Sequence, residues 1–408
     1  MRILFITPRL PFPPLRGYQL RAWHQLRLLS RRHSITLACY SDAPDSSEAL
    51  RQLSTYCEEI IRVPYRAWRS IGAVCIGIVR GKPLQSCIYE TPEMRRAIGS
   101  LLAEKRHEVA HVQLARMAGF LDGETSIPRV IDLVDALSLN LRRRGSFDRA
   151  PLRLLANAEA NRLLTYEREI CRTWDRAIVV SPVDRAAIGD FANLSINPSG
   201  VDLEEFRFQS EGRDPHEILF TGNLGYFSNV DAITWFAREI FPQIAEQDPT
   251  VKLTIVGARP DRKVRALAKL DGRIAVTGWV EKLPPYPRRC AVAIAPMRAG
   301  SGQLFKVLEA MACGAPLVVT EVVADAIAAQ GGRHMMIADK PQAFAEAVLR
   351  LMREKSLASH IAREARALVE DEYQWERSVS DLETVYHSLV EQAATQKGKR
   401  QRAEAAAS

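Results

Sequence analysis

The stretch that decides the fold is Ser301-Gly302-Gln303-Leu304-Phe305-Lys306-Val307-Leu308-Glu309-Ala310-Met311-Ala312-Cys313-Gly314. Apolar runs at residues 291–297 and 317–320 lie on either side of it. Short apolar runs bounded by turn-forming residues are typical of buried strands. Ser301 is a residue type that caps the start of a helix, and Gly314 is a type that ends one. The pattern therefore predicts a strand, a loop that becomes a helix, and a second strand.

The predicted helix has two different faces, because successive residues turn by about 100° around its axis. One arc contains the apolar side chains of Leu304, Val307, Leu308 and Met311. The opposite arc contains Gly302, Lys306, Glu309 and Cys313. We expect the first arc to pack on the core and the second to form a narrow polar line.

This polar line suits a phosphate followed by a sugar ring. The first N–H groups of a helix have no partner within the helix and attract an anion, and Lys306, one turn beyond Gly302, adds a positive charge. Glu309 lies about 10 Å along the axis from Gly302, at about 1.5 Å per residue, which places it near hydroxyl groups further along a nucleotide. We therefore predict a phosphate and then a ribose along this line. Periodicity alone leaves open an ordinary helix with a solvated Lys–Glu pair.

The composition is that of a globular enzyme with two domains. A chain of 408 residues is too long for one ordinary core. Its 47% hydrophobic and 25% charged residues do not fit a disordered or fibrous protein. The longest apolar run, residues 71–79, is too short to span a bilayer, and the N-terminus lacks the pattern of a signal peptide. Seven cysteines without any Cys-x-x-Cys pair argue against a disulfide framework or a zinc site. We expect a cytoplasmic protein.

The net charge of +8 comes from the first half of the chain. Residues 1–190 contain 29 Lys and Arg against 20 Asp and Glu, whereas residues 191–408 contain 27 against 28. An anionic partner is expected for the first half, either a membrane surface, a phosphorylated substrate or nucleic acid. No recognised nucleic-acid-binding module accompanies the charge, so we do not expect nucleic acid.

Strand-like runs recur through both halves and favour a parallel α/β fold. In the first half they fall at residues 3–7, 35–40, 60–63, 109–114, 130–134 and 177–181. In the second half they fall at residues 218–223, 253–257, 274–278, 292–296, 317–320 and 335–339, with helices near 230–246, 261–269 and 341–354. Turn-forming residues cluster at 198–202 and again at 209–215. We predict an N-terminal domain over 1–207, a C-terminal domain over 208–375, a helix over 376–395 that returns to the first domain, and a basic tail over 396–408. The two domains are expected to face each other across a cleft that holds the site.

The loop after the first strand, residues 8–17, is rich in proline and ends in Gly17 before a helix. Loops at the carboxyl end of a parallel strand are where ligands bind in such folds. The loop lacks the Gly-x-Gly-x-x-Gly pattern, so an NAD site is not supported.

Several segments now support a resemblance to a known family. In chain order they are Gly222-Asn223-Leu224, Ile255-Val256-Gly257, Val276-Thr277-Gly278-Trp279-Val280, Val292-Ala293-Ile294-Ala295-Pro296 and Leu308-Glu309-Ala310-Met311-Ala312-Cys313-Gly314-Ala315-Pro316-Leu317-Val318-Val319. Together they resemble the nucleotide-binding half of the family 4 glycosyltransferases, which are retaining enzymes with the two-Rossmann-domain GT-B architecture. The likeness extends to residues 196–202 and to Tyr373-Gln374-Trp375. Residues 130–135, 229–231 and 306–312 are similar to the sugar transferases associated with exosortase-type exopolysaccharide loci.

The resemblance implies a site for a nucleotide-diphosphate sugar in the second half. The donor-binding residues that we expect are Gly222, Asn223, Gly257, Ser301, Gly302, Gln303, Lys306 and Glu309. The family counterpart of Glu309 binds the ribose hydroxyls. The family usually has another Glu eight residues earlier, holding the donor sugar, and this chain has Ser301 there. The basic residues that often hold the diphosphate after the first strand of the second domain are replaced by Asn223 and by Ser228 or Asn229, so we expect Arg298 and Lys306 to stabilise the diphosphate.

The acceptor is expected on the first domain, near Gly17, Arg21, His111 and Gln113. The His that the family often has beyond the fourth strand appears as Gln113, and His111 lies on the same face of a regular strand. The family mechanism implies retention without a metal or other cofactor, and the chain has no Asp-x-Asp sequence. The implied partners are a nucleotide sugar and a glycan or polyprenyl-phosphate-linked acceptor of exopolysaccharide or cell-surface glycan synthesis, reached from the inner membrane face. A catalytically silent sugar-nucleotide-binding or scaffold protein stays open as the alternative.

Overall fold

The chain folds into two compact units, and the computed structural model describes residues 1–41, 47–147, 149–300 and 302–407. Unit 1 comprises Met1–Val180, Asp184–Asn197 and Trp375–Ser408, and unit 2 comprises Ser181–Val183 and Pro198–Gln374. The main boundary therefore follows Asn197, at the first of the two turn-forming segments, earlier than the predicted break at 207/208.

Unit 1 contains a seven-stranded sheet in the order β3-β2-β1-β4-β5-β6-β7, and all its pairings are parallel. Its strands are β1 (Arg2–Thr7), β2 (Ser34–Ser41), β3 (Glu59–Pro64), β4 (Val109–Gln113), β5 (Arg129–Val134), β6 (Arg176–Val179) and β7 (Leu194–Ile196). The strands predicted for the first half are confirmed. Sequence reasoning missed β7, which has only three residues and one buried side chain, and so gives no periodic signal.

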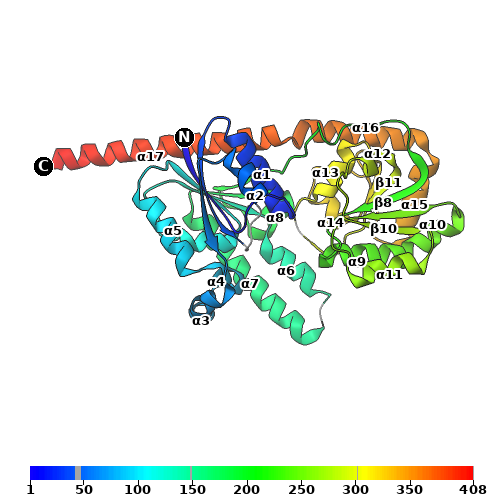
Figure 1. Cartoon of the computed structure of the whole chain (residues 1–408), viewed down its shortest axis with the longest axis horizontal. Coiled ribbons are helices and arrows are strands. Elements are labelled where there is room, and N and C mark those ends of the chain that lie inside the picture. The colour runs from blue at the N-terminus through cyan, green and yellow to red at the C-terminus, as the bar shows by residue number, and fades with distance from the viewer. Residues whose placement is uncertain (42–46, 148, 301, 408) are drawn as a thin grey trace. The chain divides into compact units, whose positions relative to one another are not determined.

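Helices cover both faces of this sheet (Figure 1). They are α1 (Gly17–Leu29), α2 (Ser47–Ser54), α3 (Ile71–Val79), α4 (Leu84–Tyr89), α5 (Pro92–Ala103), α6 (Leu137–Gly145), α7 (Ala150–Thr173), α8 (Pro182–Ile188) and α17 (Trp375–Ala407), with short 3₁₀ turns η1 (Ala67–Ser70) and η2 (Ala115–Phe120). Helix α17 returns to unit 1 and packs on α1, as predicted. Its apolar side chains Val379, Leu382 and Leu389 are buried. The helix continues to Ala407, well beyond the predicted end at residue 395.

Unit 2 contains a six-stranded parallel sheet in the order β10-β9-β8-β11-β12-β13. Its strands are β8 (Asp214–Thr221), β9 (Lys252–Val256), β10 (Ile274–Gly278), β11 (Cys290–Ala295), β12 (Leu317–Val319) and β13 (Met336–Ile337). Its helices are α9 (Phe227–Trp235), the π-helical turn η3 (Phe236–Ile240), α10 (Phe241–Gln247), α11 (Arg262–Leu270), α12 (Pro285–Arg289), α13 (Phe305–Ala312), α14 (Glu321–Ala324), α15 (Pro341–Arg353) and α16 (Lys355–Glu372). The predicted strands are confirmed here too, whereas α16 was not predicted.

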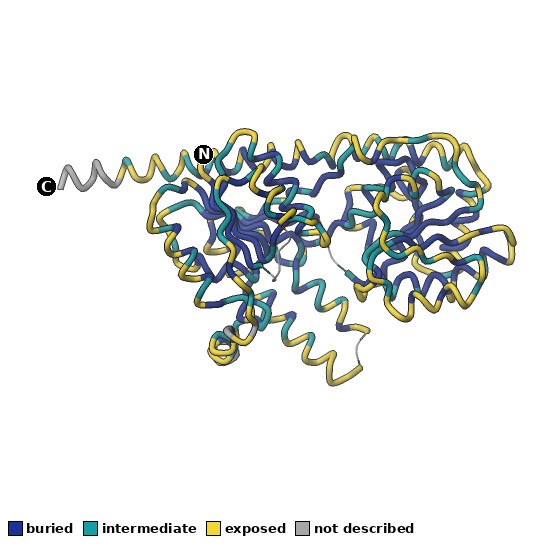
Figure 2. Tube along the Cα trace, in the orientation of Figure 1, coloured by how far each residue is buried: buried dark blue, intermediate teal, exposed yellow. Residues whose placement is uncertain are grey.

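The central strands of both sheets are buried along most of their length (Figure 2), whereas the edge strands β3, β10 and β13 are more exposed. Parallel strands covered by helices on both faces read as continuous apolar runs, which is why the sequence revealed them. In each sheet the chain reverses its direction of travel once, between β1 and β4 in unit 1 and between β8 and β11 in unit 2. In open α/β sheets, ligands bind outside the carboxyl ends of the strands at such a reversal. The topology of unit 2 therefore predicts a ligand site at the loops after β8 and β11.

The loops after β8 and β9 approach each other so closely that only glycine fits. Gly222 follows β8 with φ of 151°, and Gly257 follows β9 with φ of 156°. A Cβ atom on Gly257 would lie 1.7 Å from the carbonyl oxygen of Gly222. The two loops are also joined by a hydrogen bond from the Gly222 N–H to the Val256 carbonyl, at 3.0 Å.

This close approach predicts that Gly257→Ala lowers the free energy of unfolding by about 2–4 kcal/mol, through the backbone clash and the strained φ. Chemical denaturation of the purified variant measures the loss. Gly272→Ala is the matched control, because a Cβ atom on Gly272 has no neighbour within 4 Å. Equal stabilities of the two variants would contradict the packing described here.

Candidate functional site

Helix α13 begins at Phe305, and its N-cap residue is Leu304, which has no side-chain capping bond. The prediction that Ser301 caps this helix was therefore wrong. The backbone between β11 and α13 instead turns through Gly300 and Gly302, with φ of 125° and 73°, so the helix starts one turn later than the sequence pattern suggested. Ser301 itself lies outside the described residues.

Two arginines hold the other end of α13. Arg366 donates to the Ala312 carbonyl at 2.7 Å, and Arg213 donates to the Cys313 carbonyl at 2.8 Å. Gly314 follows with φ of 71°, as predicted for a helix end. Positive groups at a helix C-terminus satisfy its last carbonyls and oppose the negative end of its dipole. The helix is thereby fixed at the end far from the loops after β8 and β11.

The apolar face of α13 is confirmed, while the opposite face is more enclosed than predicted. Val307, Leu308 and Met311 have no exposed surface. On the opposite face Lys306 and Glu309 are half-buried, but Cys313 is fully buried. The polar line is therefore short and consists of two charged side chains in an otherwise packed helix.

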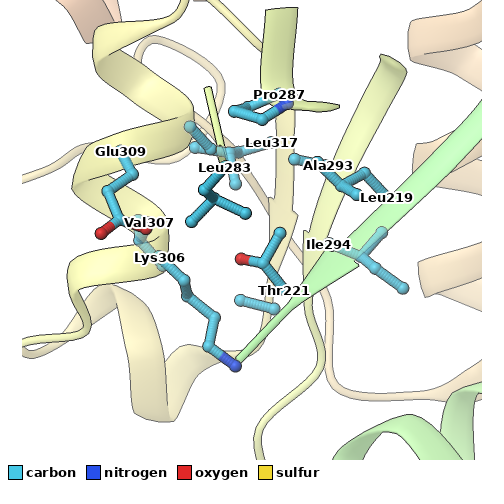
Figure 3. A pocket seen from close by; sticks show the side chains of 12 residues that line it. Leu219, Thr221, Leu283, Pro287, Ala293, Ile294, Lys306, Val307, Glu309 and Leu317 are labelled. Carbon is cyan, nitrogen blue, oxygen red and sulfur yellow. The ribbon is translucent and has the colours of Figure 1, made fainter. Parts of the chain in front are cut away.

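The ammonium group of Lys306 reaches the carboxyl end of β8 (Figure 3). Its Nζ donates to Asn229 Oδ1 at 2.6 Å and lies 4.2 Å from the centre of the Phe220 ring. A Cβ atom on Gly222 would lie 2.8 Å from the same Nζ. Lys306 is thus placed next to the Gly222 backbone, at the carboxyl end of one of the two strands between which the sheet reverses.

Asn229, at the start of α9, is the residue that fixes this arrangement. Its Oδ1 accepts from Lys306, and its Nδ2 donates to the Asn223 carbonyl at 2.9 Å. The buried amide therefore ties α13 to the loop after β8. Sequence reasoning noted Asn229 as a replacement for a basic residue and missed its contact with Lys306, because no pattern in the sequence connects it with that residue, 77 positions later.

Lys306 and Glu309 line one side of a small pocket between α13 and the sheet. The remaining lining is mostly apolar and includes Leu283, Pro287 and Leu317, with the hydroxyl group of Thr221 among them (Figure 3). Burial lowers the pKa of Lys306 to about 7, and the Glu309 carboxylate opposes this shift. Burial also raises the pKa of Glu309 to about 7, with Glu205 adding to the shift and Lys306 opposing it. Both charges are therefore costly without a ligand.

The loop before α13 contains a buried amide with unused hydrogen-bonding capacity. Gln303 Oε1 accepts from the Ser199 N–H at 2.7 Å, which joins this loop to the segment at 198–202. Its Nε2 has no hydrogen-bond partner among the residues that the structure describes. Gly302 beside it is buried as well. An oxygen-rich ligand would satisfy such a donor.

Arg298, after β11, is engaged by a carboxylate. Its Nε and Nη2 donate to the two oxygens of Asp231 at 3.0 and 2.6 Å, and its guanidinium lies 5.1 Å from the centre of the Trp235 ring. This bidentate pair orients the group and offsets its charge. A diphosphate role for Arg298 stays a prediction, and it requires that the guanidinium be shared with Asp231 or released from it.

The acceptor residues predicted in unit 1 occupy its interior. Arg21, His111 and Gln113 have no exposed surface. Arg21 Nε lies 2.6 Å from Asp132 Oδ2, and its Nη2 donates to Asn197 at 2.9 Å. His111 Nδ1 lies 2.7 Å from the hydroxyl oxygen of Tyr386.

Gln113 is likewise committed within the unit, since Thr7 donates to its Oε1 and its Nε2 donates to the Tyr18 carbonyl, both at 2.9 Å. An acceptor could touch the side chains of Arg21, His111 or Gln113 only if this network opened. In this structure they join β1, β4, α1 and α17. Gly17, by contrast, is exposed at the start of α1, and its acceptor role stays a prediction.

Burial in the interior of unit 1 also changes the pKa of His111. Desolvation lowers the pKa of His111 to about 4, and the neighbouring Asp132 opposes that shift. His111 is therefore neutral at ordinary pH.

Among the described residues, no group of three or more His, Cys, Asp or Glu side chains is arranged to hold a metal ion. Within the same residues, no helix is long and apolar enough to cross a membrane.

Parts of the chain are similar in sequence to known proteins. The family model described as "Glycosyl transferases group 1" matches residues 215–354, which contain every described donor candidate in unit 2. The chain is 25% identical over 188 residues to an "Uncharacterized 44.6 kDa protein in cps region" of Klebsiella pneumoniae, covering 44% of this chain and 48% of that protein. It is 26% identical to a D-inositol 3-phosphate glycosyltransferase of Acidothermus cellulolyticus, covering 59% of this chain and 58% of that protein. The chain thus spans about half the length of the curated relatives it matches.

Solved structures match nearly the whole chain. Sucrose-phosphate synthase from Thermosynechococcus elongatus has a TM-score of 0.69 at 15% identity, with 95% of this chain and 99% of that chain covered. Anabaena HepE in complex with UDP-glucose has a TM-score of 0.67 at 14% identity, with 95% and 100% covered. With two parallel Rossmann-like sheets, the chain has the GT-B fold. Residues 215–354 resemble the group 1 glycosyltransferases.

The buried ion pair of unit 1 predicts a large loss of stability when one partner is removed. Asp132→Ala is expected to cost about 3–5 kcal/mol, because it leaves the Arg21 charge buried without its carboxylate. Asp190→Ala is the control, since the Asp190 side chain is 92% exposed in its pair with Arg185, and it is expected to cost less than about 0.5 kcal/mol. Urea unfolding of both variants compares them. Similar losses for the two would contradict a structural role for Asp132.

The pKa values near 7 of Lys306 and Glu309 predict proton exchange when a sugar nucleotide binds. An anion beside Lys306 favours its charged form, so the complex takes up protons just above pH 7. Hydroxyl groups that donate to Glu309 favour its ionised form, so the complex releases protons just below pH 7. Calorimetric titrations in buffers of different ionisation enthalpy measure both effects.

Two variants separate these contributions. Lys306→Arg keeps a positive charge at all ordinary pH values and should abolish the uptake. Glu309→Gln cannot ionise and should abolish the release. A wild-type protein that binds a sugar nucleotide without exchanging protons on either side of pH 7 would contradict the placement of these side chains at the ligand.

Proposed function

We propose that this protein is a retaining glycosyltransferase that uses a nucleotide-diphosphate sugar as its donor. The observation that carries the proposal is the position of Lys306. Its ammonium group lies beside the Gly222 backbone at the strand reversal of unit 2, held by Asn229. The match of residues 215–354 to the group 1 glycosyltransferases supports it. The similar HepE structure, solved with UDP-glucose, supports a sugar nucleotide as the ligand.

The proposed donor site combines a positively charged side chain with groups that form hydrogen bonds to the ligand. Lys306 and the backbone N–H groups around Gly302 bind the diphosphate, and Gly222 allows it to approach the backbone closely. Gln303 Nε2 offers an additional donor beside them. Glu309, one turn beyond Lys306, accepts hydrogen bonds from the ribose hydroxyls. Gly257 maintains the spacing between the two loops, and Asn223 closes the loop after β8 by accepting from the Gly225 N–H at 3.1 Å.

Catalysis then consists of stabilising the departing diphosphate. In the proposed retaining reaction, the acceptor hydroxyl attacks the anomeric carbon on the face from which the diphosphate leaves. The bond from that carbon to the diphosphate oxygen breaks, and the leaving diphosphate takes the proton of the hydroxyl. Lys306 and Arg298 offset the negative charge that develops on the leaving group. Such a reaction needs positioned cations and donors rather than a carboxylate base, and we propose that it proceeds without a metal.

The proposed acceptor is a glycan or a polyprenyl-phosphate-linked sugar in the synthesis of exopolysaccharide or another cell-surface glycan. The cps-region relative of Klebsiella pneumoniae and the basic first half of the chain support this assignment. We propose that the protein works in the cytoplasm at the inner face of the plasma membrane. A link to exosortase systems rests on the sequence resemblance alone.

The proposal is tested by donor hydrolysis. The purified protein is incubated with a panel of sugar nucleotides, and release of nucleoside diphosphate is measured. We expect slow release from one donor, and Lys306→Ala and Arg298→Ala each to raise the barrier by about 2–4 kcal/mol. Lys269→Ala serves as the control, because Lys269 is an exposed lysine at the end of α11 in the same unit.

The panel also distinguishes the alternative of a catalytically silent protein. Thermal stabilisation by a sugar nucleotide without any release of nucleoside diphosphate would favour a binding or scaffold function. Wild-type rates in the Lys306→Ala and Arg298→Ala variants would overturn the assignment of the leaving-group site.

A further inference from the structure

Unit 1 exposes two groups of large apolar side chains that the donor site does not use. The first, which we call the α3 patch, consists of Trp68, Ile71, Ile76 and Val79, with 62%, 61%, 56% and 88% of their surface exposed. Helix α3 has the sequence IGAVCIGIV and contains no charged residue. An amphipathic surface helix normally turns polar side chains to water, so a helix without any requires another surface to cover it.

The second group, which we call the hairpin tip, lies where α6 and α7 meet. It consists of Phe147, Leu152, Leu154 and Leu155, with 38%, 59%, 70% and 68% of their surface exposed. The two helices are in close contact here, since a Cβ atom on Gly145 would lie 3.0 Å from the Cβ of Ala156. The two helices therefore pack closely beside the exposed leucines.

Basic residues border both groups in the sequence. Residues 66–82 contain four basic residues and no acidic one, and residues 142–158 contain five arginines and a single aspartate. Arg66 and Arg80, at the two ends of the α3 patch, are exposed. Arg142, Arg144, Arg149 and Arg153 are exposed around the hairpin tip. The α3 patch and the hairpin tip thus share one chemistry, which is apolar side chains bordered by arginine.

The two groups also lie along one side of unit 1. In Figure 1, α3 and the free end of the α6–α7 hairpin both project from the lower side of the unit, and Figure 2 shows exposed residues at both. They are linked through the fold, because the backbone N–H of Leu84, at the start of α4, donates to Glu159 of α7 at 2.6 Å. Helix α4 in turn packs on α3.

We propose that the α3 patch and the hairpin tip dock unit 1 on an anionic lipid bilayer. The apolar side chains enter the boundary between headgroups and acyl chains, and the arginines bind lipid phosphates. Association of two copies through these surfaces would place arginines against arginines, which the charge pattern disfavours. A negatively charged membrane satisfies both parts of the pattern at once.

The inference deepens the lipid-linked acceptor of the proposed function by naming the surface that reaches the membrane. Its test needs neither donor nor acceptor, so failure of the docking surface and failure of the transferase are separate results. The measurement is flotation of the full chain with vesicles of phosphatidylglycerol and phosphatidylcholine in equal parts, compared with phosphatidylcholine alone. We expect binding to the mixed vesicles at low salt, and weaker binding as salt screens the arginines.

Three sets of substitutions locate the surface. Ile76→Ser with Val79→Ser removes apolar area from the α3 patch, and Leu154→Ser with Leu155→Ser does so at the hairpin tip. Each pair is expected to lower the fraction of bound protein by about tenfold or more, from the lost apolar contact alone. Leu270→Ser is the matched control, because Leu270 is 57% exposed on α11 of unit 2 and lies in neither group. All of these positions are exposed, and circular dichroism checks that the variants fold.

Wild-type protein that does not float with the mixed vesicles at low salt would overturn the proposal. So would binding that the four patch substitutions leave at the level of Leu270→Ser. Size-exclusion chromatography without lipid adds a further outcome. A dimer that the same substitutions dissociate would show that a second copy, rather than a membrane, covers these surfaces.

Discussion

The proposed site depends on one contact, the hydrogen bond between the Lys306 ammonium group and the buried amide of Asn229. Burial makes the charge on Lys306 costly, and its pKa falls to about 7 as a result. The helix that contains Lys306 is anchored at its far end by hydrogen bonds from Arg213 and Arg366. A diphosphate would supply the missing negative charge. The position of this lysine beside the Gly222 backbone at the strand reversal, together with the cost of its buried charge, is the physical reason to regard the pocket as a binding site.

Much of this arrangement could be predicted from the sequence. The central strands of unit 2 are buried on both faces, so they appear as apolar runs, and the 3.6-residue period revealed the buried face of α13. The spacing of Lys306 and Glu309 placed both on one face, and the structure confirms that they line the same pocket. What the sequence concealed was the partner. Asn229 meets Lys306 only through the tertiary fold, and a neutral asparagine gives no charge signal. The predicted start of the helix was also wrong. Gly300 and Gly302 have positive φ, and α13 begins only at Phe305.

In the first half of the chain, the sequence was a poor guide to the predicted acceptor site. Polar residues of β4 and α1 suggested an acceptor site, yet Arg21, His111 and Gln113 are buried in the interior of unit 1, where Arg21 contacts Asp132 and His111 contacts Tyr386. A single sequence cannot distinguish an arginine that is buried with a carboxylate partner from an arginine that binds a ligand, since both occur at similar positions in the sequence. The exposed apolar side chains of α3 were visible as a run too short to cross a membrane. Only the structure showed that this run lies on the surface of unit 1 rather than in its core.

The most direct test of the central claim is a crystal structure of the protein with a nucleoside diphosphate. We expect a phosphate oxygen within hydrogen-bonding distance of Lys306 Nζ and beside the Gly222 backbone, with the ribose hydroxyls at the Glu309 carboxylate. A nucleotide bound elsewhere, with Lys306 still bonded to Asn229 and Glu309 turned away from the ribose, would contradict the proposed site.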